Sequence, residues 1–284
     1  MRKSLILLEI IKFEHTIFAL PFAFLGAFLA AQGLPELSVL IWIVLAMVGG
    51  RSAAMAFNRQ VDRVFDGLNP RTSNRALPSG LISPHLVTIF ILSSSALFFF
   101  SAWMLNKLAF HLSPIALATV FFYSYTKRFT TLSHLLLGLS LAMAPVGGWI
   151  AVSGTFHPTS LWIGAAVLFW VGGFDIIYSC LDSEFDRDVG LHSMPSRLGI
   201  KTSLKISVLS HILMILLLSY GFWELELSLM SWVGLVIVSL GLTYEHTLIS
   251  AEDLSRIDTA FFTINGLISA VLFTFVALDL CLMS

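Results

Sequence analysis

The chain is a succession of long apolar runs joined by short polar loops. A membrane-spanning helix needs about 20 consecutive apolar residues. Nine runs suit such helices, at 10–31, 37–57, 84–104, 109–126, 132–152, 160–180, 203–222, 229–248 and 260–282. The pattern predicts an all-α polytopic membrane protein in which nine transmembrane helices form a bundle. We expect one domain over residues 1–284, embedded in the lipid bilayer.

Composition agrees with a membrane protein. Of 284 residues, 57% are hydrophobic and only 12% are charged, and the mean hydropathy is +0.89. A soluble domain carries about 25% charged residues. Cys180 and Cys281 are too few for a disulfide framework, and the eight histidines include no pair three or four residues apart. Neither a redox site nor a zinc site is expected.

The basic residues are divided unevenly between the two sides of the predicted bundle. Fourteen Lys and Arg residues fall on the side of the N-terminus, and only Lys107 falls on the other, with Arg51 inside a span left out of the count. Cytoplasmic loops carry such an excess of basic residues. We therefore expect the loops 58–83 and 181–205, which hold the candidate active site described below, to lie in the cytoplasm. The expected location is a bacterial inner (plasma) membrane, which the multi-pass protein would span.

The first polar constellation begins where the second apolar run ends. Asn58, Asp62 and Asp66 are spaced by four residues, so on a continuous helix they share one face, with a drift of about 40° per step. An Asp or Asn at a helix end is often only a cap. Two such clusters on the same side of the membrane instead favour a functional site.

The second constellation follows the sixth apolar run. Asp175, Asp182 and Asp186 lie within about 20° of one line on a helix, and Tyr178 lies about 60° away. Glu184 and Asp188 point to roughly the opposite side. The periodicity selects the first three aspartates as site residues and predicts that the last two acids are solvated.

Carboxylate and amide oxygens without thiolates or imidazoles suit Mg²⁺. The two acidic clusters look like a site for a metal ion and a diphosphate. Unit charges about 4 Å apart interact by about 4 kcal/mol at an effective dielectric of about 20. A diphosphate would therefore be repelled by these carboxylates unless cations lay between them. Guanidinium groups suit phosphate recognition. Basic residues near the two clusters are therefore candidates for phosphate binding, although positive-inside topology alone also places cations there; they are Arg63, Arg71, Arg75, Lys127 and Arg128.

The two constellations resemble the signatures of a known family. Asn58-x3-Asp62-x3-Asp66, followed by Arg-Thr-Ser-Asn-Arg-Ala-Leu-Pro-Ser-Gly at 71–80, is similar to the first motif of the UbiA-type intramembrane aromatic prenyltransferases. Asp175-x2-Tyr178-x3-Asp182-x3-Asp186 is similar to the second. The family pattern usually has Asp where this chain has Arg59. Lys12 is the best match for a basic residue that many members carry in the first helix.

The resemblance implies a Mg²⁺-dependent polyprenyltransferase of quinone biosynthesis. Asp175 and Tyr178 would act on the acceptor, and Arg128 would hold its carboxylate. The substrates would be a polyprenyl diphosphate and a hydroxylated aromatic acid, with no nucleic-acid partner. The other implied roles are metal binding by Asn58, Asp62, Asp66, Asp182 and Asp186, and substrate binding by Lys12, Arg63, Arg71, Arg75, Lys127 and Arg128.

Several alternatives stay open at this point. The default acceptor for this family branch is 4-hydroxybenzoate, of the ubiquinone route, and the main alternative is a dihydroxynaphthoate acid, of the menaquinone route. Haem O and chlorophyll synthesis are further family activities. An ion-coupled transporter is a rival of another class, but its acids would lie near the bilayer midplane. A CDP-alcohol phosphotransferase would need a further aspartate pair after Gly80, where the chain reads Leu81-Ile82-Ser83-Pro84. Neither prenyl length nor oligomeric state can be read from the sequence.

Overall fold

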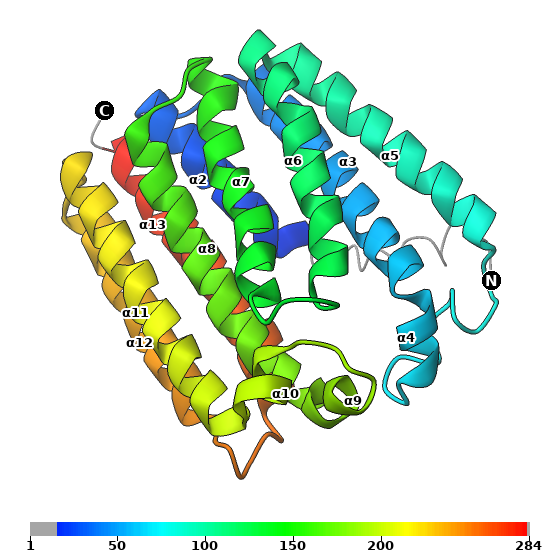
Figure 1. Ribbon diagram of the computed structural model, residues 1–284. Coiled ribbons are helices and arrows are strands. Elements are labelled where there is room, and N and C mark those ends of the chain that lie inside the picture. Colours follow the sequence, from blue (N-terminus) through cyan, green and yellow to red (C-terminus); the bar gives the residue numbers. More distant parts are fainter. Residues whose placement is uncertain (1–15, 283–284) are drawn as a thin grey trace.

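The computed structural model describes residues 16–282, and these form a bundle of helices (Figure 1). Eight helical segments are long and apolar enough to cross a membrane, and α2 is a shorter apolar helix. The first five apolar helices are α2 (Thr16–Ala31), α3 (Leu37–Val61), α5 (Pro84–Leu105), α6 (Lys107–Thr126) and α7 (Ser133–Ser153). They are followed by α8 (Pro158–Ser179), α11 (Ile200–Glu224), α12 (Leu229–Thr247) and α13 (Asn265–Leu282), which continues the π-helical turn η3 (Thr259–Ile264).

The observed helices coincide with the predicted runs to within a few residues. Pro114 lies inside α6 without ending it. The first predicted run, 10–31, is confirmed only from Thr16 onward, because its earlier part, with Lys12, lies outside the described residues. All-helical architecture is therefore confirmed for 16–282, with eight clear spans and one shorter apolar helix.

The helices pack in a closed order. Going round the bundle, α3 packs on α5, then α6, α7, α8, α11, α12, α13 and α2 follow, and α2 packs on both α3 and α7. The main core lies where α2, α8, α11, α12 and α13 meet, with Phe22 on Trp170 at a ring-centroid distance of 4.7 Å. Helix α7 thus faces the core on one side and α6 on the other.

Helices α2 and α7 approach closely because two glycines lie at their crossing. A Cβ on Gly148 would lie 1.9 Å from the carbonyl oxygen of Ala23, and one on Gly26 would lie 1.9 Å from that of Pro145. Small residues commonly permit such backbone contacts between membrane helices. This contact fixes α7, which lines the site described below.

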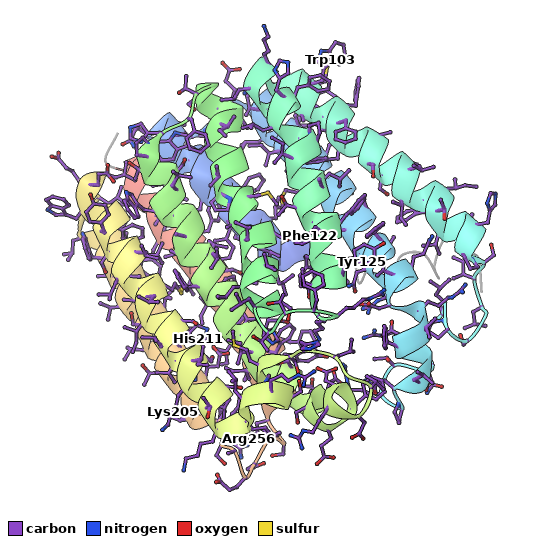
Figure 2. All side chains as sticks on the ribbon, viewed as in Figure 1. Trp103, Phe122, Tyr125, Lys205, His211 and Arg256 are labelled. Carbon is purple, nitrogen blue, oxygen red and sulfur yellow. The ribbon has the colours of Figure 1, made fainter. Side chains whose placement is uncertain are left out.

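Short helices lie at one end of the bundle only. They are α4 (Arg63–Leu68), the 3₁₀ turn η2 (Cys180–Asp182), α9 (Ser183–Asp188) and α10 (Met194–Leu198). Lys205 and Arg256 lie at the end that carries α9 and α10, whereas Trp103 lies at the opposite end (Figure 2). The polar loops and the acidic constellations therefore share one end of the molecule.

The predicted helical continuity is wrong at both constellations. Helix α3 ends at Val61, Asp62 has φ −88° and ψ 5°, and a new helix begins at Arg63. In the second constellation α8 ends at Ser179, and the 3₁₀ turn η2 precedes α9. The acids therefore do not lie along single straight helix faces.

Candidate active site

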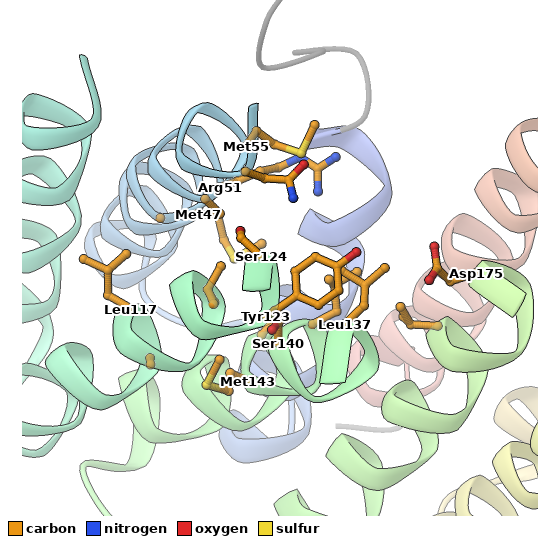
Figure 3. Close-up of a pocket in the computed structure, with 18 of the residues that line it drawn as sticks. Met47, Arg51, Met55, Leu117, Tyr123, Ser124, Leu137, Ser140, Met143 and Asp175 are labelled. Carbon is orange, nitrogen blue, oxygen red and sulfur yellow. The ribbon is translucent and has the colours of Figure 1, made fainter. Parts of the chain in front are cut away.

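A cavity of about 670 Å³ opens among α3, α6, α7 and α8, and its two ends differ chemically. Figure 3 gives a close view of a pocket that contains Arg51, Tyr123 and Asp175. Both acidic constellations, with their neighbouring basic residues, line the polar end. Mostly apolar side chains line the remainder, among them Ile43, Met47, Phe98, Leu112 and Val146. The lining of the cavity therefore suits a ligand with one charged end and one long apolar end.

The fold brings every predicted carboxylate to this cavity. Asn58 on α3, Asp62 at its C-cap and Asp66 on α4 line one wall; Asp175, Tyr178, Asp182 and Asp186 line the other. The loop after α4 joins the two walls. Asn69 donates from Nδ2 to Asp182 Oδ1 over 3.0 Å, and Arg71 donates from Nη1 to the Tyr178 hydroxyl over 3.1 Å.

Arginines pair with the carboxylates across the site. Arg75 Nη1 lies 2.6 Å from Asp66 Oδ1, and Arg71 forms a bidentate pair with Asp182. Burial alone would lower the pKa of Arg71, but the hydrogen bond and charge of Asp182 outweigh it, and the pKa of Arg71 is raised. These contacts hold two guanidiniums beside the cavity, where they can also meet phosphate oxygens.

Lys127 carries a further positive charge into the same end. Burial alone would lower the pKa of Lys127, but the carboxylates of Asp186, Asp175 and Asp182 outweigh that effect and raise it. Because its pKa lies above the ordinary value, Lys127 stays protonated throughout the neutral range. It lines the cavity and forms no ion pair within 16–282.

Among the carboxylates that line the cavity, two buried oxygens are left without a hydrogen-bond partner in the described part of the chain. They are Asp66 Oδ2 and Asp186 Oδ2. A buried carboxylate oxygen without a hydrogen bond is costly, and a bound cation would offset that cost. No three His, Cys, Asp or Glu side chains of residues 16–282 are grouped so as to hold an ion by themselves. The donor set therefore fits Mg²⁺ held by few carboxylates and completed by phosphate oxygens and water.

The structure does not bring Arg63, one of the predicted substrate-binding residues, to the cavity. Arg63 is exposed and lines a separate depression with Val64 and Pro78. Its placement follows from the break at Asp62, which changes the direction in which the next helix presents its residues. Lys12 lies outside the described residues. The predicted solvation of Glu184 and Asp188 is confirmed, since both are exposed on α9.

Arg128 lies in the cavity wall, but its guanidinium already contacts two groups of the protein. Its Nη2 donates to the Val61 carbonyl over 2.9 Å and lies 3.6 Å from Asp62 Oδ1. Burial raises the pKa of Asp62, against the pull of Lys127 and Arg128. This arginine therefore fastens the α6–α7 loop to the end of α3.

Arg51 was not among the predicted site residues, and it lines the cavity. It lies seven residues before Asn58, about 10 Å deeper along α3. Its Nε is buried without a hydrogen-bond partner, and Arg51 forms no ion pair within the described residues. A lone arginine in an apolar span was the available sequence signal. Arg59 stands where the family usually has an acid, and its Nη1 lies 3.8 Å from Asp66 Oδ2.

Comparison with known proteins identifies the family. The model of the UbiA prenyltransferase family matches residues 19–267. The chain belongs to this family. Family membership confirms the resemblance read from the two acidic motifs and makes the protein a prenyltransferase. It favours prenyl transfer over ion-coupled transport and over CDP-alcohol phosphotransfer.

Individual relatives are similar to this protein over most of the chain. A 4-hydroxybenzoate octaprenyltransferase of Nitrosomonas europaea is 31% identical over 255 residues, covering 89% of this chain and 86% of the relative. One of Vibrio cholerae is 32% identical over 226 residues, 79% of either chain. The apo structure of a UbiA homologue from Aeropyrum pernix is 35% identical, with a TM-score of 0.86 over 94% of this chain and 98% of the other. A homologue from Archaeoglobus fulgidus, solved with DMAPP and Mg²⁺, shares the fold at 22% identity and a TM-score of 0.74, over 95% and 99% of the two chains.

Proposed function

We propose that this protein transfers a polyprenyl group from a polyprenyl diphosphate to 4-hydroxybenzoate, and that it requires Mg²⁺. The observation that carries the proposal is the distribution of charged and apolar side chains along the cavity. Carboxylates with unpaired buried oxygens, arginines and a lysine gather at its polar end, and an apolar space continues from there. The acceptor is proposed from the names of relatives that are 31% and 32% identical.

The polar end would hold the diphosphate. Mg²⁺ bound through Asn58, Asp62, Asp66, Asp182 and Asp186 would neutralise the charge that grows on the leaving diphosphate. Arg71, Arg75 and Lys127 line the same end and would bind phosphate oxygens directly. The bond between the first prenyl carbon and the diphosphate oxygen breaks, and its electron pair leaves with the diphosphate.

The acceptor ring would lie between the polar end and the apolar space. The ring carbon ortho to the hydroxyl attacks the first prenyl carbon, a carbon–carbon bond forms, and the proton on the attacked carbon is lost. Asp175 would orient the phenol or accept its proton, and Tyr178, held by Arg71, would close the wall beside it. Arg51, which has no carboxylate partner among the described residues, is better placed than Arg128 to receive the acceptor's carboxylate.

The end with both acidic constellations is proposed to face the cytoplasm, which the excess of basic residues supports. In a Cys281→Ser background, we expect Asn74→Cys to resist a membrane-impermeant maleimide on intact cells and to react after lysis. Lys107→Cys, at the other end of the bundle, should react on intact cells. Both positions are exposed, whereas Cys180 is buried. The reverse labelling pattern would overturn the assignment.

The function is tested by a transfer assay on the purified protein in lipid vesicles. Radiolabelled polyprenyl diphosphate is offered with 4-hydroxybenzoate or with a dihydroxynaphthoate acid, each with Mg²⁺ and with EDTA. We expect labelled prenyl-hydroxybenzoate only when Mg²⁺ is present. Transfer to the naphthoate acid alone would contradict the proposed acceptor, and full transfer in EDTA would contradict the metal requirement.

A further inference from the structure

Asp175 is held by a histidine that lies behind the cavity wall. His134, on the first turn of α7, is fully buried, and its Nδ1 lies 2.7 Å from Asp175 Oδ2. Asp175 lines the cavity from α8, whereas His134 does not reach the cavity. The histidine therefore contacts the carboxylate from the side away from the substrates.

The second ring nitrogen determines which way the proton points. The backbone amide of Met194 donates to His134 Nε2 over 3.2 Å. A nitrogen that accepts a hydrogen bond carries no proton, so the neutral ring carries its proton on Nδ1 and donates it to Asp175. This contact occupies Oδ2, while Oδ1 has no hydrogen-bond partner among the described residues.

We propose that His134 is a positioning residue, which fixes the Asp175 carboxylate so that Oδ1 meets the acceptor's hydroxyl. The inference rests on the proposed function, because Asp175 has this task only if a phenol binds. A base held by a second group, which is held in turn by the backbone, is a recurrent arrangement at catalytic sites. His134 itself touches neither substrate.

The same contact ties the base to the loop after the second acidic constellation. Met194 is the first residue of α10, eight residues beyond Asp186. The backbone amide of His192 in this loop also donates to the Lys127 carbonyl over 2.7 Å. Helices α7, α8 and α10 therefore meet at His134, and the position of Asp175 is coupled to the segment that follows the diphosphate-binding acids.

Two matched variants separate the donor function of His134 from its place in the core. Asn places an amide nitrogen where Nδ1 lies, so His134→Asn keeps a donor to Asp175. His134→Leu has similar bulk and no donor, and both variants leave the Met194 amide unpaired. We expect His134→Leu to lower kcat by about 10–100-fold, as for other residues that orient catalytic groups. We expect His134→Asn to stay within a few-fold of wild type, with the KM for prenyl diphosphate little changed in both.

A double-mutant cycle tests whether the effect passes through Asp175. In an Asp175→Asn background, His134→Leu should have little further effect on kcat, because the group that it positions is already lost. Additive losses would overturn the inference. So would equal kcat values for His134→Leu and wild type, or equal losses in the Leu and Asn variants.

A readout that needs no turnover keeps this inference distinct from the proposed function. Nitrogen NMR of histidine-labelled protein should find one ring protonated on Nδ1 only, and His134→Asn should remove its signals. Asp175→Asn should shift these signals. Protonation on Nε2 would overturn the positioning role even in an active enzyme. A wild-type protein that prenylates no hydroxybenzoate would overturn the proposed function, while the NMR result would still decide the pairing.

Discussion

Asp186→Asn lowers kcat for prenyl transfer by about 10²–10³-fold or more, whereas Asp188→Asn stays within a few-fold of wild type. Asp186 is only 2% exposed and lines the cavity, and its Oδ2 has no hydrogen-bond partner within residues 16–282, so its charge is available to a metal ion. Removing it leaves charge on the leaving diphosphate unbalanced, and losses of this size follow the removal of one stabilising group. Asp188 is exposed two residues further on.

The pair is a close control because both changes remove one negative charge from the same short helix. Initial rates at saturating substrates, measured over a range of Mg²⁺ concentrations, should show a raised Mg²⁺ requirement in Asp186→Asn only. Glu184→Gln, also exposed on α9, should behave like Asp188→Asn. Similar losses in the Asp186 and Asp188 variants would mean that α9 does not present its acids as the structure places them.

The membrane helices were predictable because their signal is local. A run of about 20 apolar residues has few alternatives to a spanning helix, since every backbone polar group must be satisfied inside the bilayer. Pro114 remained inside its helix for a related reason, because neighbouring helices compensate for a missing hydrogen bond. The predicted helix ends differ from the observed ones by a few residues; α3, for example, runs four residues beyond the predicted 57.

The site was predictable in composition but not in geometry. Periodicity selected Asn58, Asp62 and Asp66 correctly as neighbours, yet the helix breaks at Asp62, and the loop beyond α4 completes the site. That break also explains why Arg63, adjacent in sequence, turned out to lie outside the cavity. Spacing within one segment does not determine where a chain turns.

Contacts between distant segments had no sequence signal of their own. The pairing of His134 with Asp175 joins residues 41 positions apart, and that of Asn69 with Asp182 joins residues 113 apart. Each depends on how α7, α8 and the loops pack. Arg51 is an intermediate case. Its cost inside an apolar span was visible in the sequence, but its place on the cavity wall required the fold.

Arg51→Met raises the KM for 4-hydroxybenzoate by about 30-fold or more and leaves the KM for prenyl diphosphate nearly unchanged. The guanidinium has no carboxylate partner within residues 16–282, so it is available to pair with a substrate carboxylate. Removing one partner from a buried, hydrogen-bonded charge pair costs about 2–5 kcal/mol, and 2 kcal/mol corresponds to about 30-fold. Steady-state kinetics with each substrate varied in turn measure the effect.

Stability gives this prediction a second, opposite readout. A lone arginine within a span costs about 2.5–3.5 kcal/mol on insertion scales, so Arg51→Met should unfold at the same temperature as wild type or higher while binding the acceptor more weakly. Arg63→Met removes the same charge from an exposed position outside the cavity and should leave both KM values unchanged.

An uncharged phenol offered as acceptor separates two roles of Arg51, recognition of the carboxylate and shaping of the cavity. If Arg51 binds the carboxylate, the substitution should hardly change the KM for the phenol. Equal rises for the phenol and for 4-hydroxybenzoate would mean that Arg51 shapes the cavity and does not recognise the acid.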